Sequence, residues 1–326
     1  MLVLSARDVR RALPFAECAA AMRDALTALA AGEVSQPLRT VVRPDGAAGT
    51  MMLMPSYRRG SEPGYALKAL CLTPSNPAAG LDAHQGIVLL SAAGTGEPLA
   101  VLNASAVTEI RTAAVSAVAT ELLARPDADV LAIIGTGVQA RSHLLAIAAS
   151  RQLADIRVAG RERSQADAFA ASVQPETSAL VRGCGSAAEA VSGAGLVVTA
   201  TSSPVPVLDR GWLADGTHIN AVGAHTAGTR ELDGATVAAA AFFADSRDSV
   251  RSESGDFLLA LTDGLISADH IQAELGEVLT GAAPGRTSTE QITVFESLGL
   301  AVEDLAAAAL AYQRAVADGV GCDVPF

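Results

Sequence analysis

The chain has 326 residues, half of them hydrophobic, and carries a formal net charge of −12. This length exceeds the usual size of one hydrophobic core, so two domains are expected, and an acidic chain without a basic run is a poor partner for nucleic acid. Aromatic residues make up only 3%. Alanine, valine and leucine must therefore build the core, which is typical of a parallel sheet covered by helices.

Cysteine spacing and terminal composition suggest an ordinary cytoplasmic location. The four cysteines lie far apart, without a C-x-x-C pair, and the five histidines show no H-x-x-x-H spacing. We therefore expect reduced thiols and no metal site. The N-terminus lacks the charge order of a signal peptide, and no apolar run reaches membrane-spanning length, so no membrane partner is expected.

The first part of the chain combines helices with a strand meander. Residues 5–31 have an amphipathic helical pattern, with Ser5 or Pro14 near its starts. Short apolar runs alternate with Pro/Gly/Asp turns over 36–102, which predicts one antiparallel or mixed sheet. A long helix is predicted at 106–124, and Arg125-Pro126 after it is a plausible domain boundary.

Strand and helix patterns alternate regularly in the middle of the chain, which predicts parallel strands in a doubly wound α/β sheet. The strands are predicted at 130–134, 155–159, 178–182, 196–200, 218–222 and 241–245. Residues 246–282 are predicted to be mostly helical. The segment 299–318 is predicted to form a last helix.

The segment DVLAIIGTGVQARSHLLAIAA, residues 129–149, joins a strand, a glycine turn and a helix. In a Rossmann unit Gly135 permits the turn, Gly137 lets the backbone approach a pyrophosphate, and Ala140 is the third small position. This pattern predicts a dinucleotide site rather than an ordinary strand–helix turn. The candidate cofactor-binding residues here and at the following strand ends are Gly135, Thr136, Gly137, Val138, Gln139, Thr201 and Val222.

The end of the second strand of this unit favours NADP(H). Its tip is Gly160, where NAD enzymes carry an acidic residue. Arg161, Arg163 and Ser164 follow and offer guanidinium groups and a hydroxyl to a 2′-phosphate. Glu162 keeps NAD(H) possible, and a merely solvated helix start is the alternative.

Several segments in order resemble the ornithine cyclodeaminase/μ-crystallin family. They include QPLRTVV (36–42), LMPSY (53–57), ALKAL (66–70), VTEIRTAAVSAVAT (107–120), IIGTGVQA (133–140), HINAVGAHT (218–226), REL (230–232), ESGD (253–256), ELGEVLTG (274–281) and TVFESLGLAVEDLAAA (293–308). The resemblance implies a discontinuous α+β substrate-binding and dimerisation domain, 1–124 with 300–326, and a Rossmann-type dinucleotide-binding domain, 125–299. It also implies a homodimer in which the antiparallel strands of two first domains meet.

The same resemblance implies the substrate-binding residues. Arg39 stands in the family's QPxR motif, Lys68 at its active-site lysine and Arg111 in its RTAA motif. Three cations would neutralise a substrate α-carboxylate, and an arginine can hold it with two hydrogen bonds. Lys68 lies in an apolar strand, so its ammonium must be paired or have a lowered pKa. An intramolecular salt bridge is the alternative for Arg111, and Arg43 is a rival to Arg39 without motif support.

His225 departs from the cyclodeaminases of the family, which carry an aspartate there. A histidine cannot supply a permanent negative charge to a substrate ammonium, but it titrates near neutrality and could donate a proton or a hydrogen bond. A polar contact at the cofactor edge is the alternative. Glu253 of the ESGD segment is a further catalytic candidate, and a solvated helix carboxylate is its alternative.

These residues predict an NAD(P)H-dependent oxidoreductase acting on C=N bonds. The expected substrate is a small cyclic imino acid, Δ1-pyrroline-2-carboxylate or Δ1-piperideine-2-carboxylate. The alternatives are an alanine dehydrogenase-like or opine-like amino-acid dehydrogenase, and a cyclising ammonia-lyase that acts on ornithine. A non-enzymatic protein that holds NADPH is the least favoured hypothesis.

Overall fold

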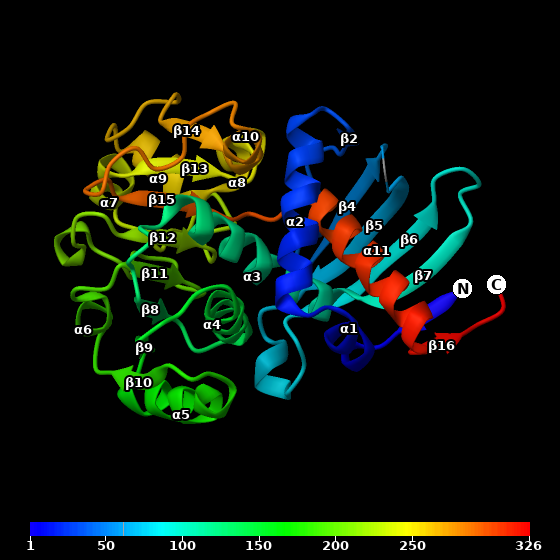
Figure 1. Ribbon diagram of the computed structural model, residues 1–326, viewed down its shortest axis with the longest axis horizontal. Coiled ribbons are helices and arrows are strands. Elements are labelled where there is room, and N and C mark those ends of the chain that lie inside the picture. Colours follow the sequence, from blue (N-terminus) through cyan, green and yellow to red (C-terminus); the bar gives the residue numbers. More distant parts are fainter. Residues whose placement is uncertain (61) are drawn as a thin grey trace. The chain divides into compact units, whose positions relative to one another are not determined.

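The computed structural model describes residues 1–60 and 62–326, which form two compact units (Figure 1). Unit 1 comprises Met1–Arg111 and Gly299–Phe326, and unit 2 comprises Thr112–Leu298. The division falls inside helix α3 (Ala104–Leu123), ahead of the Arg125-Pro126 boundary expected from the sequence. The predicted α/β fold class, with a parallel sheet and covering helices, is confirmed.

Unit 1 is built on a mixed sheet with the strand order β16-β1-β7-β6-β5-β4-β2, and β3 pairs with β4. Strands β1 and β7 run parallel, whereas the other neighbours are antiparallel. The elements are β1 (Leu2–Leu4), α1 (Ala6–Ala12), α2 (Phe15–Ala30), β2 (Val34–Ser35), β3 (Thr40–Val42), β4 (Thr50–Arg58), β5 (Gly64–Leu72), η1 (Asn76–Ala79), β6 (His84–Ala92), β7 (Pro98–Asn103), α11 (Ala301–Asp318) and β16 (Cys322–Asp323).

The helical pattern over 5–31 forms two helices, because Pro14 interrupts it. Ser5 caps α1 in a capping box with Asp8. A proline disfavours the helical conformation of the residue before it, and Leu13 leaves the helix with φ −121° and ψ 74°. Helix α2 then begins directly after Pro14.

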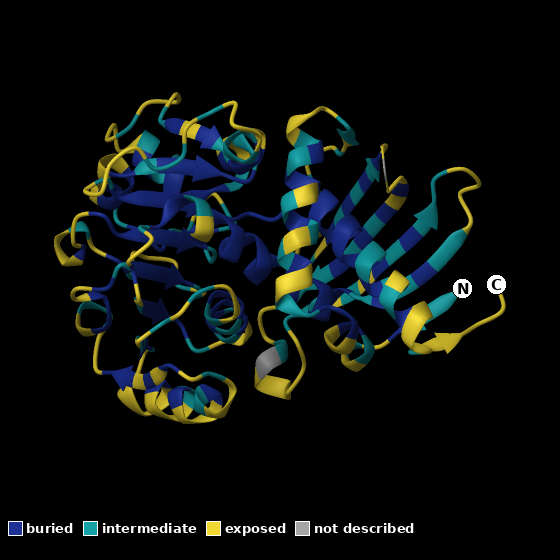
Figure 2. Ribbon diagram, viewed as in Figure 1, coloured by how far each residue is buried: buried dark blue, intermediate teal, exposed yellow. Residues whose placement is uncertain are grey.

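Helix α11 covers one face of this sheet and packs on β4, β5 and β6, with α2 beside it (Figure 1). Burial alternates along the strands of this sheet (Figure 2). Successive side chains of a strand point to opposite faces, so every second one lies on the face that α11 covers. Lys68 belongs to this buried set together with Ala66 and Leu70. Lys68 is therefore buried between its own strand, β5, and the last helix of the sequence, α11.

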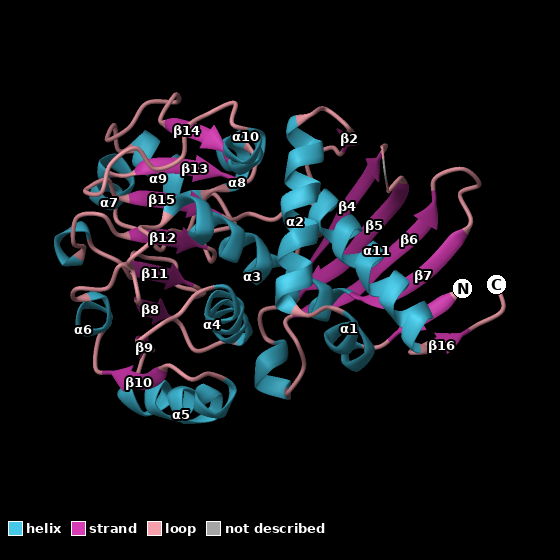
Figure 3. Ribbon diagram, in the orientation of Figure 1, coloured by secondary structure: helices cyan, strands magenta, loops and turns pink. Residues whose placement is uncertain are grey.

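Unit 2 is a parallel sheet with the order β10-β9-β8-β11-β12-β15-β13-β14, drawn as arrows in Figure 3. Its elements are β8 (Val130–Ile134), α4 (Val138–Ser150), β9 (Asp155–Ala159), α5 (Arg163–Val173), η2 (Gln174–Glu176), β10 (Leu180–Cys184), α6 (Ala187–Val191), β11 (Leu196–Thr199), η3 (Arg210–Trp212), β12 (His218–Ala221), α7 (Gly234–Ala239), β13 (Ala241–Ala244), α8 (Arg247–Glu253), α9 (Gly255–Thr262), β14 (Ile271–Glu274), α10 (Leu275–Thr280) and β15 (Thr293–Glu296).

Both faces of this sheet are covered. Ala132 and Ile134 of β8 join one hydrophobic core, whereas Leu131 and Ile133 join the other. Strands β9 and β10 lie on one side of β8, and β11 and β12 lie on the other, so the strand order reverses at β8. The carboxyl ends of the strands at such a reversal are where dinucleotides bind in sheets of this type.

The predicted strand–helix alternation of unit 2 lacks two strands that the structure has. Strand β14 lies within 246–282, which was predicted to be mostly helical, and β15 lies in ITVFESLG (292–299), a strand-like apolar run that the sequence shows outside that alternation. Each has only four residues, too few for a strand period to stand out, and β15 is buried throughout.

Among the described residues, no helix is long and apolar enough to span a bilayer.

Candidate active site

The glycine turn after β8 has the geometry that a pyrophosphate-binding loop needs. Gly135 adopts φ +130°, and a Cβ there would lie 2.3 Å from the carbonyl oxygen of Ala200. Its N–H donates to Ala159 O at 2.8 Å. Only glycine fits a position with this φ and this close approach.

The N-terminus of α4 is open beyond this turn. Gly137 is the N-cap residue, and no described side chain caps the helix. Apart from Gly137 and its two chain neighbours, no described heavy atom lies within 4 Å of a Cβ built there. The first N–H groups of a 13-residue helix therefore have no side-chain partner, and the helix dipole favours an anion at this end. The predicted residues Thr136, Val138 and Gln139 lie in this turn and first helical turn, so the structure fits a dinucleotide phosphate.

The residues predicted to select NADP(H) lie at the start of α5. Arg161, Arg163 and Ser164 are all exposed. The Nε atom of Arg163 donates to Asp167 at 3.1 Å, one helical turn along. Arg163 is thus engaged by a neighbouring carboxylate, whereas Arg161 precedes the helix.

Thr201 and Val222 follow the next two strands, β11 and β12, at the same edge of the sheet. A buried residue to which the sequence reasoning gave no role, Glu231, accepts hydrogen bonds from the N–H groups of Thr201 and Gly223 at 2.6 and 2.7 Å. Only the match of REL to a family motif drew attention to this position.

The segments that carry His225 and Glu253 meet in unit 2. Glu253 is the last residue of α8, and His225 lies in the loop after β12. Between them, Gly255 N–H donates to Ala224 O at 3.2 Å. A Cβ on Gly255 would lie 2.6 Å from Thr226 O. The structure therefore brings the two predicted segments together, with both side chains partly buried.

Lys68 forms a buried ion pair in unit 1. Its Nζ lies 2.7 Å from Oδ2 of Asp304, in the first turn of α11, and the lysine is only 1% exposed. Burial lowers the pKa of Lys68 to about 8, the charge of Asp304 opposes this shift, and the positive charges of Arg111 and Arg39 add to it. Lys68 is thus mainly an ammonium at neutral pH, with a pKa close to the physiological range.

Arg111 is held by the same helix. Its Nε donates to Asp304 Oδ1 at 3.0 Å and its Nη1 to Glu303 Oε2 at 2.8 Å. Gly299, at φ +82°, lets the chain pass directly over the guanidinium, since a Cβ there would lie 2.4 Å from Nη1 of Arg111. Arg39, partly buried, donates from Nη2 to Gly299 O at 3.1 Å.

Three cations, Arg39, Lys68 and Arg111, thus lie together with two buried carboxylates, Glu303 and Asp304. We call these five residues the unit 1 charge cluster. Its net charge is one positive, which suits one carboxylate. Glu303 and Asp304 had no predicted role, although two acids in a helix otherwise rich in alanine were the available signal.

Two other predictions concern charge and metals. Arg43, the rival to Arg39, is exposed and donates from Nε to Thr50 Oγ1 at 3.1 Å, at the end of the sheet where β3 pairs with β4. Within residues 1–60 and 62–326, no group of three or more His, Cys, Asp or Glu side chains could hold a metal ion.

Comparison with known proteins gives full-length similarities. The family model for the ornithine cyclodeaminase/mu-crystallin family matches residues 1–319. Delta(1)-pyrroline-2-carboxylate reductase of Bacillus cereus (strain ZK / E33L) is 38% identical over 327 residues, covering 100% of both chains. Ketimine reductase mu-crystallin of Mus musculus is 42% identical over 281 residues, 86% of this chain and 85% of its own.

The fold has a close counterpart among solved structures. Thermococcus litoralis Delta(1)-pyrroline-2-carboxylate reductase, in complex with NADH and L-proline, superposes with a TM-score of 0.96 at 37% identity, covering 99% of this chain and 100% of that one. The sequence similarity and the shared fold therefore extend over both units.

Proposed function

Since the chain belongs to the ornithine cyclodeaminase/mu-crystallin family, we propose that it is a nicotinamide-dependent reductase of a small cyclic ketimine carboxylate. Δ1-Pyrroline-2-carboxylate and Δ1-piperideine-2-carboxylate are the proposed substrates. The observation that carries the proposal is the unit 1 charge cluster, whose single excess positive charge matches one substrate carboxylate. The names of the two reductase relatives support the same reaction.

We propose that the cofactor binds at the glycine turn of unit 2, with its pyrophosphate at Gly135–Gln139 and its nicotinamide end toward Thr201 and Val222. A bound nicotinamide dinucleotide supplies the hydride for such a reduction. NADPH is the favoured form because Arg161, Arg163 and Ser164 are exposed at the second strand end. NADH remains the alternative, and NADH is the cofactor in the Thermococcus litoralis complex.

The chain's own residues would bind and orient the substrate. Arg39 would bind the carboxylate directly, and Lys68 and Arg111 would supply the field that keeps it there. Glu303 and Asp304 stabilise the buried cations by pairing with them, because an unpaired buried charge costs free energy. In unit 2, His225 is the proposed proton or hydrogen-bond donor, and Glu253, on the neighbouring segment, is the further catalytic candidate.

A substrate panel tests the proposal. Purified protein with NADPH or NADH is given pyrroline and piperideine carboxylates, or pyruvate with ammonia or methylamine, and loss of the reduced cofactor is followed. With NAD⁺, ornithine and lysine are offered. Turnover of a cyclic ketimine is expected. Preference for pyruvate with an amine, or robust cyclisation of ornithine, would contradict the proposal, and cofactor binding without any turnover would favour a non-enzymatic protein.

Arg39 and Arg43 form a matched pair for the carboxylate-binding role, because they lie four residues apart and only Arg39 joins the cluster. Loss of a charge-assisted hydrogen bond costs roughly 1.5–3 kcal/mol, about 10- to 150-fold. Arg39→Gln should lower kcat/KM for the ketimine by that factor without changing cofactor affinity. Arg43→Gln should change either quantity less than about twofold, and equal losses in both variants would refute the assignment.

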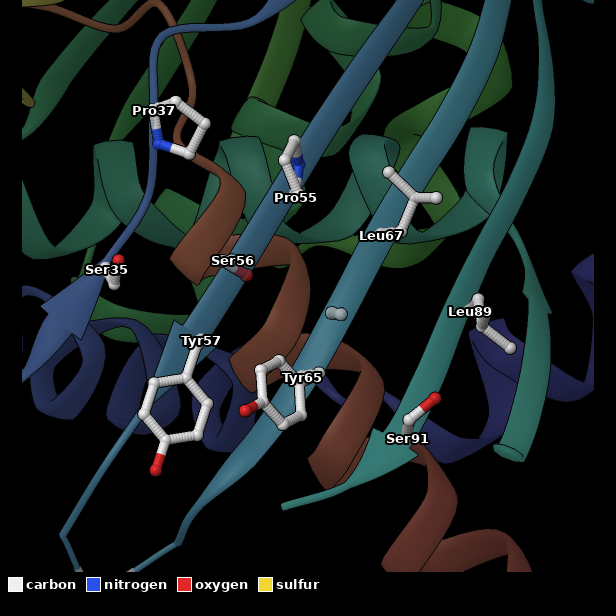
Figure 4. A pocket seen from close by; sticks show the side chains of 10 residues that line it. Ser35, Pro37, Pro55, Ser56, Tyr57, Tyr65, Leu67, Leu89 and Ser91 are labelled. Carbon is white, nitrogen blue, oxygen red and sulfur yellow. The ribbon is translucent and has the colours of Figure 1, made fainter. Parts of the chain in front are cut away.

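We further propose that the protein is a homodimer, and that the face of the unit 1 sheet opposite α11 forms the dimer interface. Large apolar side chains are exposed there, among them Met51 (44%), Tyr65 (47%) and Ile87 (46%). Tyr57 and Tyr65 are in contact, with ring centroids 4.6 Å apart and the rings tilted by 34°, and they line a depression with Pro55, Leu67 and Leu89 (Figure 4). An apolar patch of this kind marks an interface. Sedimentation should give a dimer, and Tyr65→Lys with Ile87→Lys should give a monomer.

The cytoplasmic location stays a prediction.

A further inference from the structure

Glu231 joins two loops that follow neighbouring parallel strands. Its Oε1 accepts the N–H of Thr201, just after β11, and its Oε2 accepts the N–H of Gly223, just after β12. The two bonds measure 2.6 and 2.7 Å, and Glu231 is fully buried. Each carboxylate oxygen therefore holds a different loop.

The backbones of these loops are packed against one another without side chains between them. A Cβ on Gly135 would lie 2.3 Å from Ala200 O, and one on Gly223 would lie 2.3 Å from Thr201 O. The same Cβ on Gly223 would lie 2.5 Å from Cδ of Glu231. The loops after β8, β11 and β12 thus lie side by side in the order of their strands, and Glu231 contacts the last two of them.

Glu231 is itself fixed in place. Its backbone N–H and that of Leu232 both donate to Asp256 Oδ1 at 2.8 Å. Asp256 lies in the first turn of α9, and Ser254 caps this helix. The carboxylate of Glu231 therefore has a rigid base from which to position the loops.

We propose that Glu231 is a positioning residue of the dinucleotide site, which holds the loops of Thr201 and of Val222–His225 at the spacing that the nicotinamide end of the cofactor requires. This inference rests on the proposed function for the identity of the ligand. Its consequence is specific to a glutamate side chain, whose two oxygens each accept one of these N–H groups. Glutamine has one acceptor oxygen, and its NH₂ group would face the second N–H, so one loop would be released while the packing stays nearly unchanged.

Glu231→Gln tests the inference, with Asp245→Asn as the matched control. Asp245 is also buried and also uses both oxygens, accepting from Ser246 N–H and Leu298 N–H at 2.7 Å each, but it lies beyond β13. Both variants therefore lose one charge-assisted bond to a backbone N–H. The Kd of NADPH and NADH is measured by fluorescence titration, together with Tm and with kcat and KM for both the cofactor and the ketimine.

Glu231→Gln should raise the Kd of the dinucleotides about tenfold, which corresponds to the loss of one such bond. Asp245→Asn should lower Tm comparably but change the Kd less than about twofold. Hydrogen exchange should show faster exchange at Thr201 or Gly223 in Glu231→Gln alone. Equal Kd values in Glu231→Gln and the unmodified protein would overturn the inference, because the carboxylate would then be merely structural.

Gly223→Ala covers the case in which Glu231→Gln does not fold. The added methyl would meet both Thr201 O and the carboxylate of Glu231. It therefore separates the same two loops from Glu231, so the Kd should again rise, and an unchanged Kd would overturn the inference. An unmodified protein that binds neither dinucleotide would refute the proposed function and this inference with it. A protein that binds them equally well with and without Glu231 would refute the inference alone.

Discussion

Carboxylate binding should weaken as the pH rises through about 8, because Lys68 loses its proton there. Burial lowers the pKa of this lysine from 10.5 to about 8, and the groups that bear on it are Asp304, Arg111 and Arg39. A guanidinium group in a protein carries its charge independently of pH in this range, so the ammonium is the cation that changes. When the ammonium becomes neutral, the unit 1 charge cluster passes from one excess positive charge to none, and its attraction for a monoanion falls.

The magnitude follows from the pKa. With a value of about 8, roughly 90% of Lys68 is protonated at pH 7 and roughly 10% at pH 9, so the affinity for a carboxylate should fall about tenfold over this interval. The same lowered pKa means that the unfolded chain binds this proton more tightly between about 8 and 10.5. The contribution of Lys68 to stability therefore increases with pH in that window, opposite to its effect on binding.

The assay is the inhibition constant of pyrrole-2-carboxylate at saturating cofactor, measured from pH 7 to about 9.5. This planar ring acid is chosen because its ring nitrogen does not titrate here, unlike that of an imine substrate. Lys68→Arg should flatten the profile, since a guanidinium stays charged. Arg43→Gln should keep the slope of the unmodified protein.

A constant inhibition constant across this range would refute the reasoning, and so would an equal slope in Lys68→Arg. Burial also raises the pKa of Asp256 to about 8. Any effect of Asp256 would persist in Lys68→Arg, so the variant separates the two groups. Tm values for each variant show that the comparison concerns folded protein.

Three further predictions concern the cofactor, the substrate and stability. NADPH should bind more tightly than NADH, and Arg161→Ala should narrow the difference by roughly 10- to 150-fold, the range for one charge-assisted bond; equal Kd values for both cofactors in the unmodified protein would contradict this. Ornithine with NAD⁺ should give little proline and ammonia, whereas His225→Asp should raise that activity and impair ketimine reduction, as product assays of both proteins will show. Burial raises the pKa of Asp256 from 3.8 to about 8, so the folded protein holds this proton more tightly and stability falls as the pH rises between those values. Asp256→Asn should therefore show a shallower fall in Tm over that range by calorimetry, and parallel Tm curves would refute the assignment.

Local sequence patterns were enough to predict the class of fold and the glycine turn between β8 and α4. The regular alternation of strand and helix patterns from 129 onward was sufficient, because parallel strands buried on both faces leave long apolar runs. Gly135 could be identified because a strand, a tight turn and a helix start are all local features. The motifs around Arg39, Lys68 and Arg111 likewise pointed to a family whose model matches the chain.

The groups that surround those cations depend on the fold of the whole of unit 1. Glu303 and Asp304 lie almost 200 residues from Arg111, and Asp304 lies more than 230 residues from Lys68. They reach these cations only because α11 returns to the sheet of unit 1. The carboxylate of Glu231 is similarly set by the pairing of β11 with β12. Local sequence patterns report local backbone preferences, whereas charge balance in a buried site depends on contacts between distant segments. For that reason the sequence predicted three cations, and the fold revealed the two carboxylates that leave one positive charge in excess.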